Sequence, residues 1–160
     1  MIFNIFIVLI SLIFENIFNL YFSKLNYITP LFTLISLIFV FPYFKNSKKD
    51  FYIFSLLVGL IYDLVFTNFY IINSILFLLI SIVIFYVLKN HEYNLLMIVI
   101  TSILSIFLYN ILLYLILNLY NYTNYSLIDL SYILKSFLIG NIFYCFIIYF
   151  LIMKMHIIDK

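Results

Sequence analysis

Long apolar stretches separated by short polar breaks dominate the pattern of this chain. Stretches of about 20 apolar residues are long enough to cross the hydrocarbon core of a bilayer as helices. The pattern therefore predicts an all-α, polytopic membrane protein with a bundle of six transmembrane helices. We expect one transmembrane domain over residues 1–160, with spans at 2–22, 28–44, 51–67, 70–88, 95–118 and 133–153.

Polar residues mark the breaks between these segments. Three lysines in 45–50 end the second segment, and residues 89–92 (KNHE) separate the fourth from the fifth. Pro30 is expected in the first turn of the second helix, where its missing N–H is tolerated. The polar stretch 120–131 is expected to be the longest loop. The weakest break lies at 67–68, so one long broken helix, and hence five spans, stays an alternative.

The composition supports a membrane location. The chain is 68% hydrophobic and 9% charged, with a mean hydropathy of +1.28, whereas soluble domains carry about 25% charged residues. The basic residues are all lysines, and they are few, so nucleic-acid binding has no electrostatic basis. The first segment lacks a basic start and a small-residue cleavage site, so we expect it to be a retained span.

The lysines also predict an orientation, because short cytoplasmic loops are enriched in basic residues. With six spans and the N-terminus inside, Lys24 and Lys135 fall on the outer side. The remaining lysines fall on the inner side: Lys45, Lys48, Lys49, Lys89, Lys154 and Lys160. This distribution predicts that both termini are cytoplasmic.

Asp63 is the most informative single residue, because it lies in the otherwise apolar run FYIFSLLVGLIYDLVF. A carboxylate in a lipid-buried helix is costly, so it is expected to face protein or water and to have a partner. Ser55 and Gly59 lie eight and four residues before it, on the same helix face. Small residues on this face predict that another helix approaches closely there.

Each predicted span also carries a thin polar stripe at helical spacing. Such stripes are expected to turn inward and to form hydrogen bonds between helices, each contributing about 0.6–2 kcal/mol. Six polar residues are placed in the outer half of the membrane: Glu15, Asp63, Asn73, Asn110, Lys135 and Asn141. We hypothesise that Lys135 or Asn141 satisfies one of the two acids. A proton or ion relay is the functional alternative to this structural interpretation.

Enzymatic motifs are missing from the sequence. It contains no Ser/His/Asp set, no metal-ligand spacing and no glycine-rich phosphate loop, since Gly59 and Gly140 are its two glycines. Cys145 lies in an apolar run and is interpreted as a small buried hydrophobe. We therefore expect a protein without catalytic activity, metal or cofactor.

The segment 54–63 (FSLLVGLIYD) resembles the hallmark of the rod shape-determining MreD family. The order of other features is similar to that family: Glu15 in the first helix, Pro30 opening the second, Asn73 ten residues after the aspartate, and Asn141 in the last helix. Two positions depart from the family, which often has glycine where Ser55 and Ile71 stand. The departure at Ile71 puts the turn geometry between the third and fourth helices in doubt.

The resemblance implies a non-enzymatic scaffold of the bacterial cell-elongation machinery in the plasma membrane. Such proteins bind MreC, a single-span membrane protein. Through it they work with MreB filaments and with the RodA–class B penicillin-binding protein synthase that builds peptidoglycan. The family positions carry over to Pro30, Gly59 and Asp63 and, with weaker correspondence, to Glu15, Asn73 and Asn141.

A transport component is the alternative function. Substrate-binding subunits of energy-coupling-factor transporters are also six-helix membrane proteins of similar size. Their usual Ala-x-x-x-Ala coupling motif has no counterpart, because the chain contains no alanine.

Overall fold

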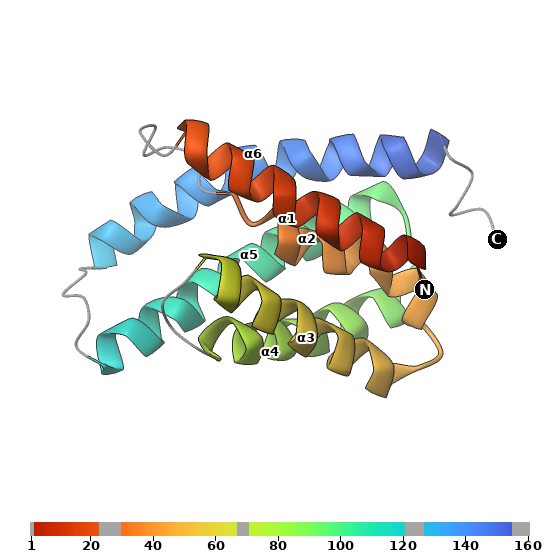
Figure 1. The fold of residues 1–160 in the computed structure, drawn as a ribbon, viewed down its shortest axis with the longest axis horizontal. Helices are drawn as coiled ribbons and strands as arrows, with labels where there is room; N and C mark the ends of the chain where they lie inside the picture. The colour runs from red at the N-terminus through yellow and green to blue at the C-terminus, as the bar shows by residue number, and fades with distance from the viewer. Residues whose placement is uncertain (1, 23–29, 67–70, 121–126, 155–160) are drawn as a thin grey trace.

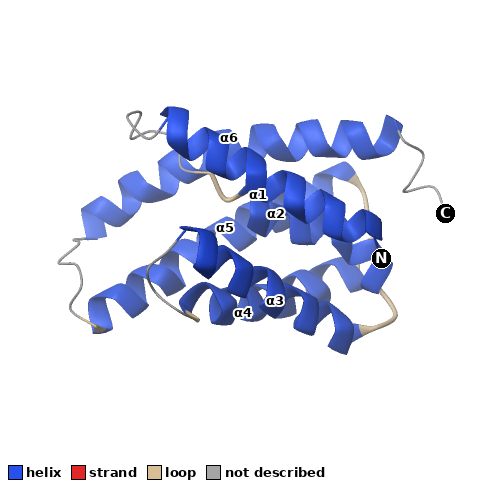
Figure 2. Ribbon diagram, viewed as in Figure 1, coloured by secondary structure: helices blue, strands red, loops and turns tan. Residues whose placement is uncertain are grey.

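The computed structural model describes residues 2–22, 30–66, 71–120 and 127–154, and these residues are helical with short connections (Figures 1 and 2). The side chains of 2–4, 127–137, 139, 153 and 154 are outside this description. The elements are α1 (Ile2–Phe22), α2 (Phe32–Val40), the 3-10 helix η1 (Phe41–Phe44), α3 (Lys48–Phe66), α4 (Ile72–Lys89), α5 (Leu95–Leu119) and α6 (Leu127–Lys154). The all-α fold class is thus confirmed for the described part of the chain.

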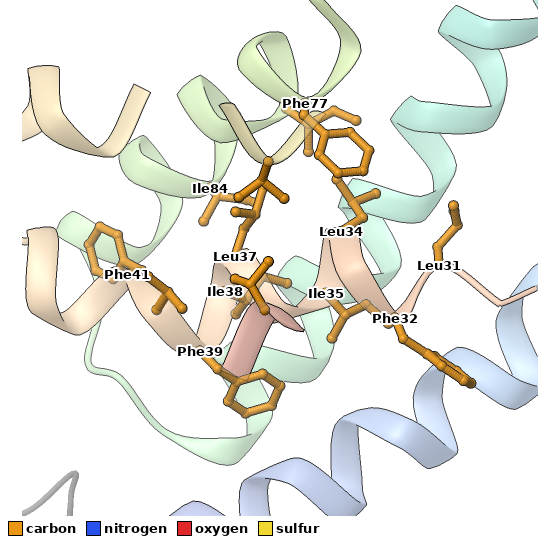
Figure 3. Close-up of a cluster of buried hydrophobic side chains, with 14 of the residues drawn as sticks. Leu31, Phe32, Leu34, Ile35, Leu37, Ile38, Phe39, Phe41, Phe77 and Ile84 are labelled. Carbon is orange, nitrogen blue, oxygen red and sulfur yellow. The ribbon is translucent and has the colours of Figure 1, made fainter. Parts of the chain in front are cut away.

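The short helix α2 forms the centre of the bundle. It contacts all five other helices, and every one of its nine residues is buried. Helices α1 and α6 lie on one side of it, and α3 and α4 lie on the other (Figure 1). Its side chains fill the core together with residues such as Phe77 and Ile84 of α4 (Figure 3). A helix enclosed in this way is largely apolar on every face, and its sequence FTLISLIFV has two polar residues, Thr33 and Ser36.

The second predicted span differs from the single helix expected over 28–44. The α-helix starts at Phe32, so Pro30 lies before the helix rather than in its first turn. The helix ends at Val40 and continues as η1, which carries Pro42 at its start. Proline lacks an N–H and its ring clashes with the carbonyl four residues earlier, which ends α-helical geometry.

The sixth helix is also longer than expected. It begins at Leu127, so the second half of the loop expected over 120–131 is helical. Asparagine, threonine and serine suggested a loop there, but the sequence has neither proline nor glycine between 121 and 139. Polar residues alone do not break a helix, and that expectation was wrong.

Helices α3 and α4 are two separate helices. They lie side by side in opposite directions (Figure 1), and their contact is the most extensive of any pair of elements described. This arrangement overturns the alternative of one long broken helix. Residues 67–70, which contain the predicted weak break, lie outside the described residues.

Two of the described helices, α4 and α5, are long and apolar enough to cross a membrane. Shorter apolar helices are found at Ile5–Tyr21, Phe32–Phe44 and Gly140–Ile152. These lengths and compositions support association with a membrane.

Candidate functional site

Glu15 of α1 lies at the start of α2. Its side chain is 0% exposed. One carboxylate oxygen, Oε2, accepts hydrogen bonds from the backbone N–H of Thr33 (2.8 Å) and from its Oγ1 (2.7 Å). The other, Oε1, accepts from the hydroxyl of Tyr62 on α3 (2.7 Å). Glu15 therefore joins three helices at one point.

The start of α2 depends on these partners, because it has no capping side chain of its own. The residue before the helix is Leu31, whose side chain cannot accept a hydrogen bond. The first N–H groups of any helix have no partner inside the helix. Here the Leu31 N–H donates to Oδ1 of Asn141 on α6 (2.7 Å), and the Thr33 N–H donates to Glu15. Side chains from α1 and α6 thus cap α2.

Asp63 of α3 lies at the start of α4 in the same way. Its side chain is 2% exposed. Its Oδ1 accepts from the N–H of Asn73 (3.2 Å) and from Nδ2 of the same residue (2.8 Å), and its Oδ2 accepts from the N–H of Ser74 (3.0 Å). The residue that precedes α4, Ile71, offers no capping side chain. Both acids therefore lie at the positive end of a neighbouring helix dipole, which stabilises negative charge.

Gly59 brings α3 against the first turn of α4. A Cβ built on Gly59 would lie 2.6 Å from Cα of Ser74 and 2.8 Å from the carbonyl oxygen of Asn73. Both are backbone atoms, so neither could move aside without shifting the helix. The close helix approach expected at Gly59 is present, and it holds Asp63, one turn further along α3, within reach of the α4 amides.

Two tyrosines connect the capped helix starts to the rest of the bundle. Tyr62 binds Glu15 and is adjacent to Asp63 in the sequence, so α3 contacts both sites. Tyr109 of α5 donates from its hydroxyl to Oδ1 of Asn73 (2.7 Å). All six helices contribute a side chain or a backbone amide to this region, which we call the double-cap region: Glu15, Leu31, Thr33, Tyr62, Asp63, Asn73, Ser74, Tyr109 and Asn141.

A further contact fastens α6 beside this region. The hydroxyls of Ser11 and Tyr144 share a hydrogen bond of 2.6 Å. The ring of Tyr144 stacks on Phe32, the first residue of α2, with 4.1 Å between ring centroids. The first turn of α2 is thus covered by apolar contact as well as capped.

The predicted site residues fall into three groups. Four of them lie in the double-cap region, and Gly59 packs against its backbone; the four are Glu15, Asp63, Asn73 and Asn141. Pro30 directly precedes this region, and Ser55 lies two turns from Asp63, with its hydroxyl bonded within α3 to the carbonyl of Tyr52 (2.9 Å). The side chain of Lys135 lies outside the described residues.

The hypothesis that Lys135 or Asn141 satisfies one of the two acids stays a prediction, because the side chain of Lys135 lies outside the described residues. One described partner of Asn141 is the backbone amide of Leu31. The described donors to the two acids come from α2, α3 and α4. Tyr62 was missed entirely, although a phenol adjacent to a buried acid in an apolar run is a usable signal.

The opposite end of the bundle carries a group of described lysines, Lys45, Lys48, Lys49 and Lys89. Lys48 at the start of α3 donates to the hydroxyl of Tyr86 on α4 (3.0 Å), and its ammonium lies over the rings of Tyr86 and Tyr52. The hydrogen bond to Tyr86 raises the pKa of the Lys48 ammonium. Burial raises the pKa of Tyr93, in the connection before α5, well above the usual value. Of the chain that the structure describes, no part gathers three or more His, Cys, Asp or Glu side chains around a metal-sized site.

Comparisons with protein-family models, with curated proteins and with solved structures returned no match for this chain. The resemblance to the MreD family therefore rests on the residues that carry it. The double-cap region is the best-defined polar site of the described structure, and its chemistry is that of hydrogen-bonded attachment between helices.

Proposed function

We propose that this chain is a multi-pass protein of the bacterial plasma membrane in which six helices cross the bilayer with both termini in the cytoplasm. The distribution of side chains supports this. Large apolar side chains such as Phe6, Leu64 and Phe143 are exposed on the outside of the bundle, whereas Glu15 and Asp63 are buried inside it. Soluble proteins rarely expose apolar surface on this scale, and in lipid polar side chains turn inward.

Within that membrane we propose a scaffold role in cell elongation, similar to MreD. The partner would be MreC, and through it MreB and the RodA–class B penicillin-binding protein synthase. The observation that carries this proposal is the use of both buried acids as helix caps. Each acid has donors from neighbouring helices, so each stabilises the bundle and does not need a substrate to be satisfied. A protein built in this way acts through its surface.

Depletion of this chain in the cell that makes it tests the proposal. We expect rod-shaped cells to become round, and an expressed copy to restore the rods. The copy should also co-purify MreC from detergent-solubilised membranes. A Gly59→Leu copy should fail in both assays, while a Leu64→Ala copy on the exposed face of the same helix should succeed.

Persistence of rods after depletion, together with absence of MreC from the purified complex, would overturn the scaffold proposal. Loss of uptake of one vitamin or metal in the same depleted cells would instead support the transport component considered above. Vitamin uptake and cell shape are measured on the same cultures, so the two functions are separated directly.

A further inference from the structure

An apolar groove of about 580 Å³ lies between α1 and α3. Its volume falls within the range of about 300–1,000 Å³ that is usual for small-molecule sites. The wall from α1 includes Ile5, Val8 and Leu9, and the wall from α3 includes Ile53, Leu57 and Ile61. The two helices contact each other little.

The groove runs from the Tyr62–Glu15 contact toward charged residues at the other end of α3. Beyond Ile61, the Tyr62 hydroxyl bonds to Glu15 and joins α3 to α1. At the opposite end the lining reaches Phe44 and Asp50, next to the basic turn between η1 and α3. From Asp50 to Ile61 the helix rises about 16 Å, which matches half of the roughly 30 Å hydrocarbon thickness of a bilayer.

Two lysines adjoin the charged end of the groove. Lys45 directly follows Phe44, and Lys49 lies one turn before Ile53 on the same face of α3. Both are exposed. Lys48 is directed away from the groove because its ammonium contacts Tyr86 and Tyr52. The charged end therefore carries two positive charges, from Lys45 and Lys49, and one negative charge, from Asp50 in the lining. Its net charge is positive.

We propose that this groove binds one acyl chain of an anionic phospholipid, with the phosphate of the lipid at Lys45 and Lys49. The proposal rests on the proposed insertion of the bundle in a membrane. An apolar groove that follows α3 over the length of one leaflet fits a single acyl chain. A complete helix is about 10–12 Å across and needs the length of both leaflets. Basic residues at the cytoplasmic surface attract anionic headgroups.

The absence of tryptophan from the chain makes a clean test possible. Leu57→Trp places a single fluorophore in the groove. Ile103→Trp is the control, because it lies at a similar distance from the start of α5, is exposed, and does not line the groove. Each variant is reconstituted in phosphatidylcholine bilayers that contain a minor fraction of brominated phosphatidylglycerol or of brominated phosphatidylcholine, and tryptophan quenching is measured.

We expect the groove tryptophan to be quenched with at least about fivefold preference for brominated phosphatidylglycerol, and the control tryptophan to show no preference. Lys45→Gln with Lys49→Gln should abolish the preference, and Asp50→Asn should increase it. Equal quenching of the groove tryptophan by both lipids would overturn the proposal. So would a groove tryptophan shielded from both lipids while the control is quenched, because a protein segment would then fill the groove. Quenching at neither position would instead contradict the membrane insertion proposed above.

Discussion

The starts of α2 and α4 are each capped by a carboxylate from another helix, and they differ in how far the chain runs between the acid and its donors. Asp63 caps a helix that begins nine residues later, across one helix hairpin. Glu15 binds Thr33, 18 residues away, and Tyr62, 47 residues away. The first contact stabilises a local hairpin, whereas the second fastens α1 to two other helices.

The helix packing around the two acids also differs, and it is more extensive around Asp63 than around Glu15. The α3–α4 pair has extensive contact, with backbone against backbone at Gly59. The α1–α3 pair has little contact beside the apolar groove, so the Tyr62–Glu15 bond is a larger part of what joins these helices. A polar contact therefore matters most where apolar packing is weakest. Five substitutions, described below with their controls, test this comparison.

Gly59→Leu should have the largest effect, because the new side chain would overlap the backbone of Ser74 and Asn73. We expect the free energy of unfolding in detergent micelles to fall by more than about 3 kcal/mol. Unfolding is followed by labelling of Cys145, which is buried in the folded protein. Leu64→Ala on the exposed face of α3 is the control and should change stability by less than about 0.5 kcal/mol. A fully stable Gly59→Leu protein would contradict the close approach of α3 and α4.

Glu15→Ala should follow, with a loss of about 3 kcal/mol, since each lost inter-helix bond contributes about 0.6–2 kcal/mol. Asp63→Ala removes the same number of described bonds but leaves the α3–α4 packing in place. We therefore expect it to cost about 2 kcal/mol. The Cys145 labelling assay, applied to both variants, measures which substitution causes the larger loss of stability. A larger loss for Asp63→Ala would reverse the comparison between the two caps.

Tyr62→Phe should cost about 1 kcal/mol, the usual net contribution of one hydrogen bond. Its effect should disappear in a Glu15→Ala background, because the bond is already lost there, and should add to that of Tyr109→Phe, which acts at the other cap. Double-mutant cycles on unfolding free energies measure the coupling of Tyr62→Phe with Glu15→Ala and with Tyr109→Phe. Additivity of Tyr62→Phe with Glu15→Ala would show that the tyrosine does not depend on the acid.

The sequence predicted the helices well, because long apolar runs interrupted by lysines leave few alternatives. It also predicted that Asp63 has a partner and that another helix approaches closely at Gly59. A buried acid needs a hydrogen-bond donor, and a glycine in an apolar run allows close helix contact. The capping partners could not be predicted in the same way. They are backbone amides of Leu31, Thr33 and Ser74, and every residue except proline carries such an amide.

The pairing hypothesis missed these amides for a related reason, because it considered only a side chain of opposite charge or matching polarity, Lys135 or Asn141. The apolar residues directly before the two helices, Leu31 and Ile71, provided the missing signal. An apolar residue directly before a helix leaves free N–H groups, so a buried acid on a neighbouring helix is a candidate cap.

Ile71→Gly should have the smallest effect, and the opposite sign. Ile71 precedes α4 with φ of 85°, in the left-handed region. This conformation costs a side-chain-bearing residue about 1–2 kcal/mol, and glycine adopts it freely at an entropic cost of about 0.5–1 kcal/mol in the unfolded state. Because the Ile71 side chain is 56% exposed, little packing is lost. We therefore expect a net gain of about 0.5 kcal/mol.

Ile75→Gly provides the matched control, one turn later on the same helix and similarly exposed. There the backbone is helical, so glycine should destabilise the protein by about 1 kcal/mol. The two glycine variants should thus differ in sign when Cys145 labelling is compared during unfolding. If both variants lost stability equally, the left-handed turn at Ile71 would carry no strain. The cap at Asp63 would then stabilise a turn that isoleucine adopts as readily as glycine does.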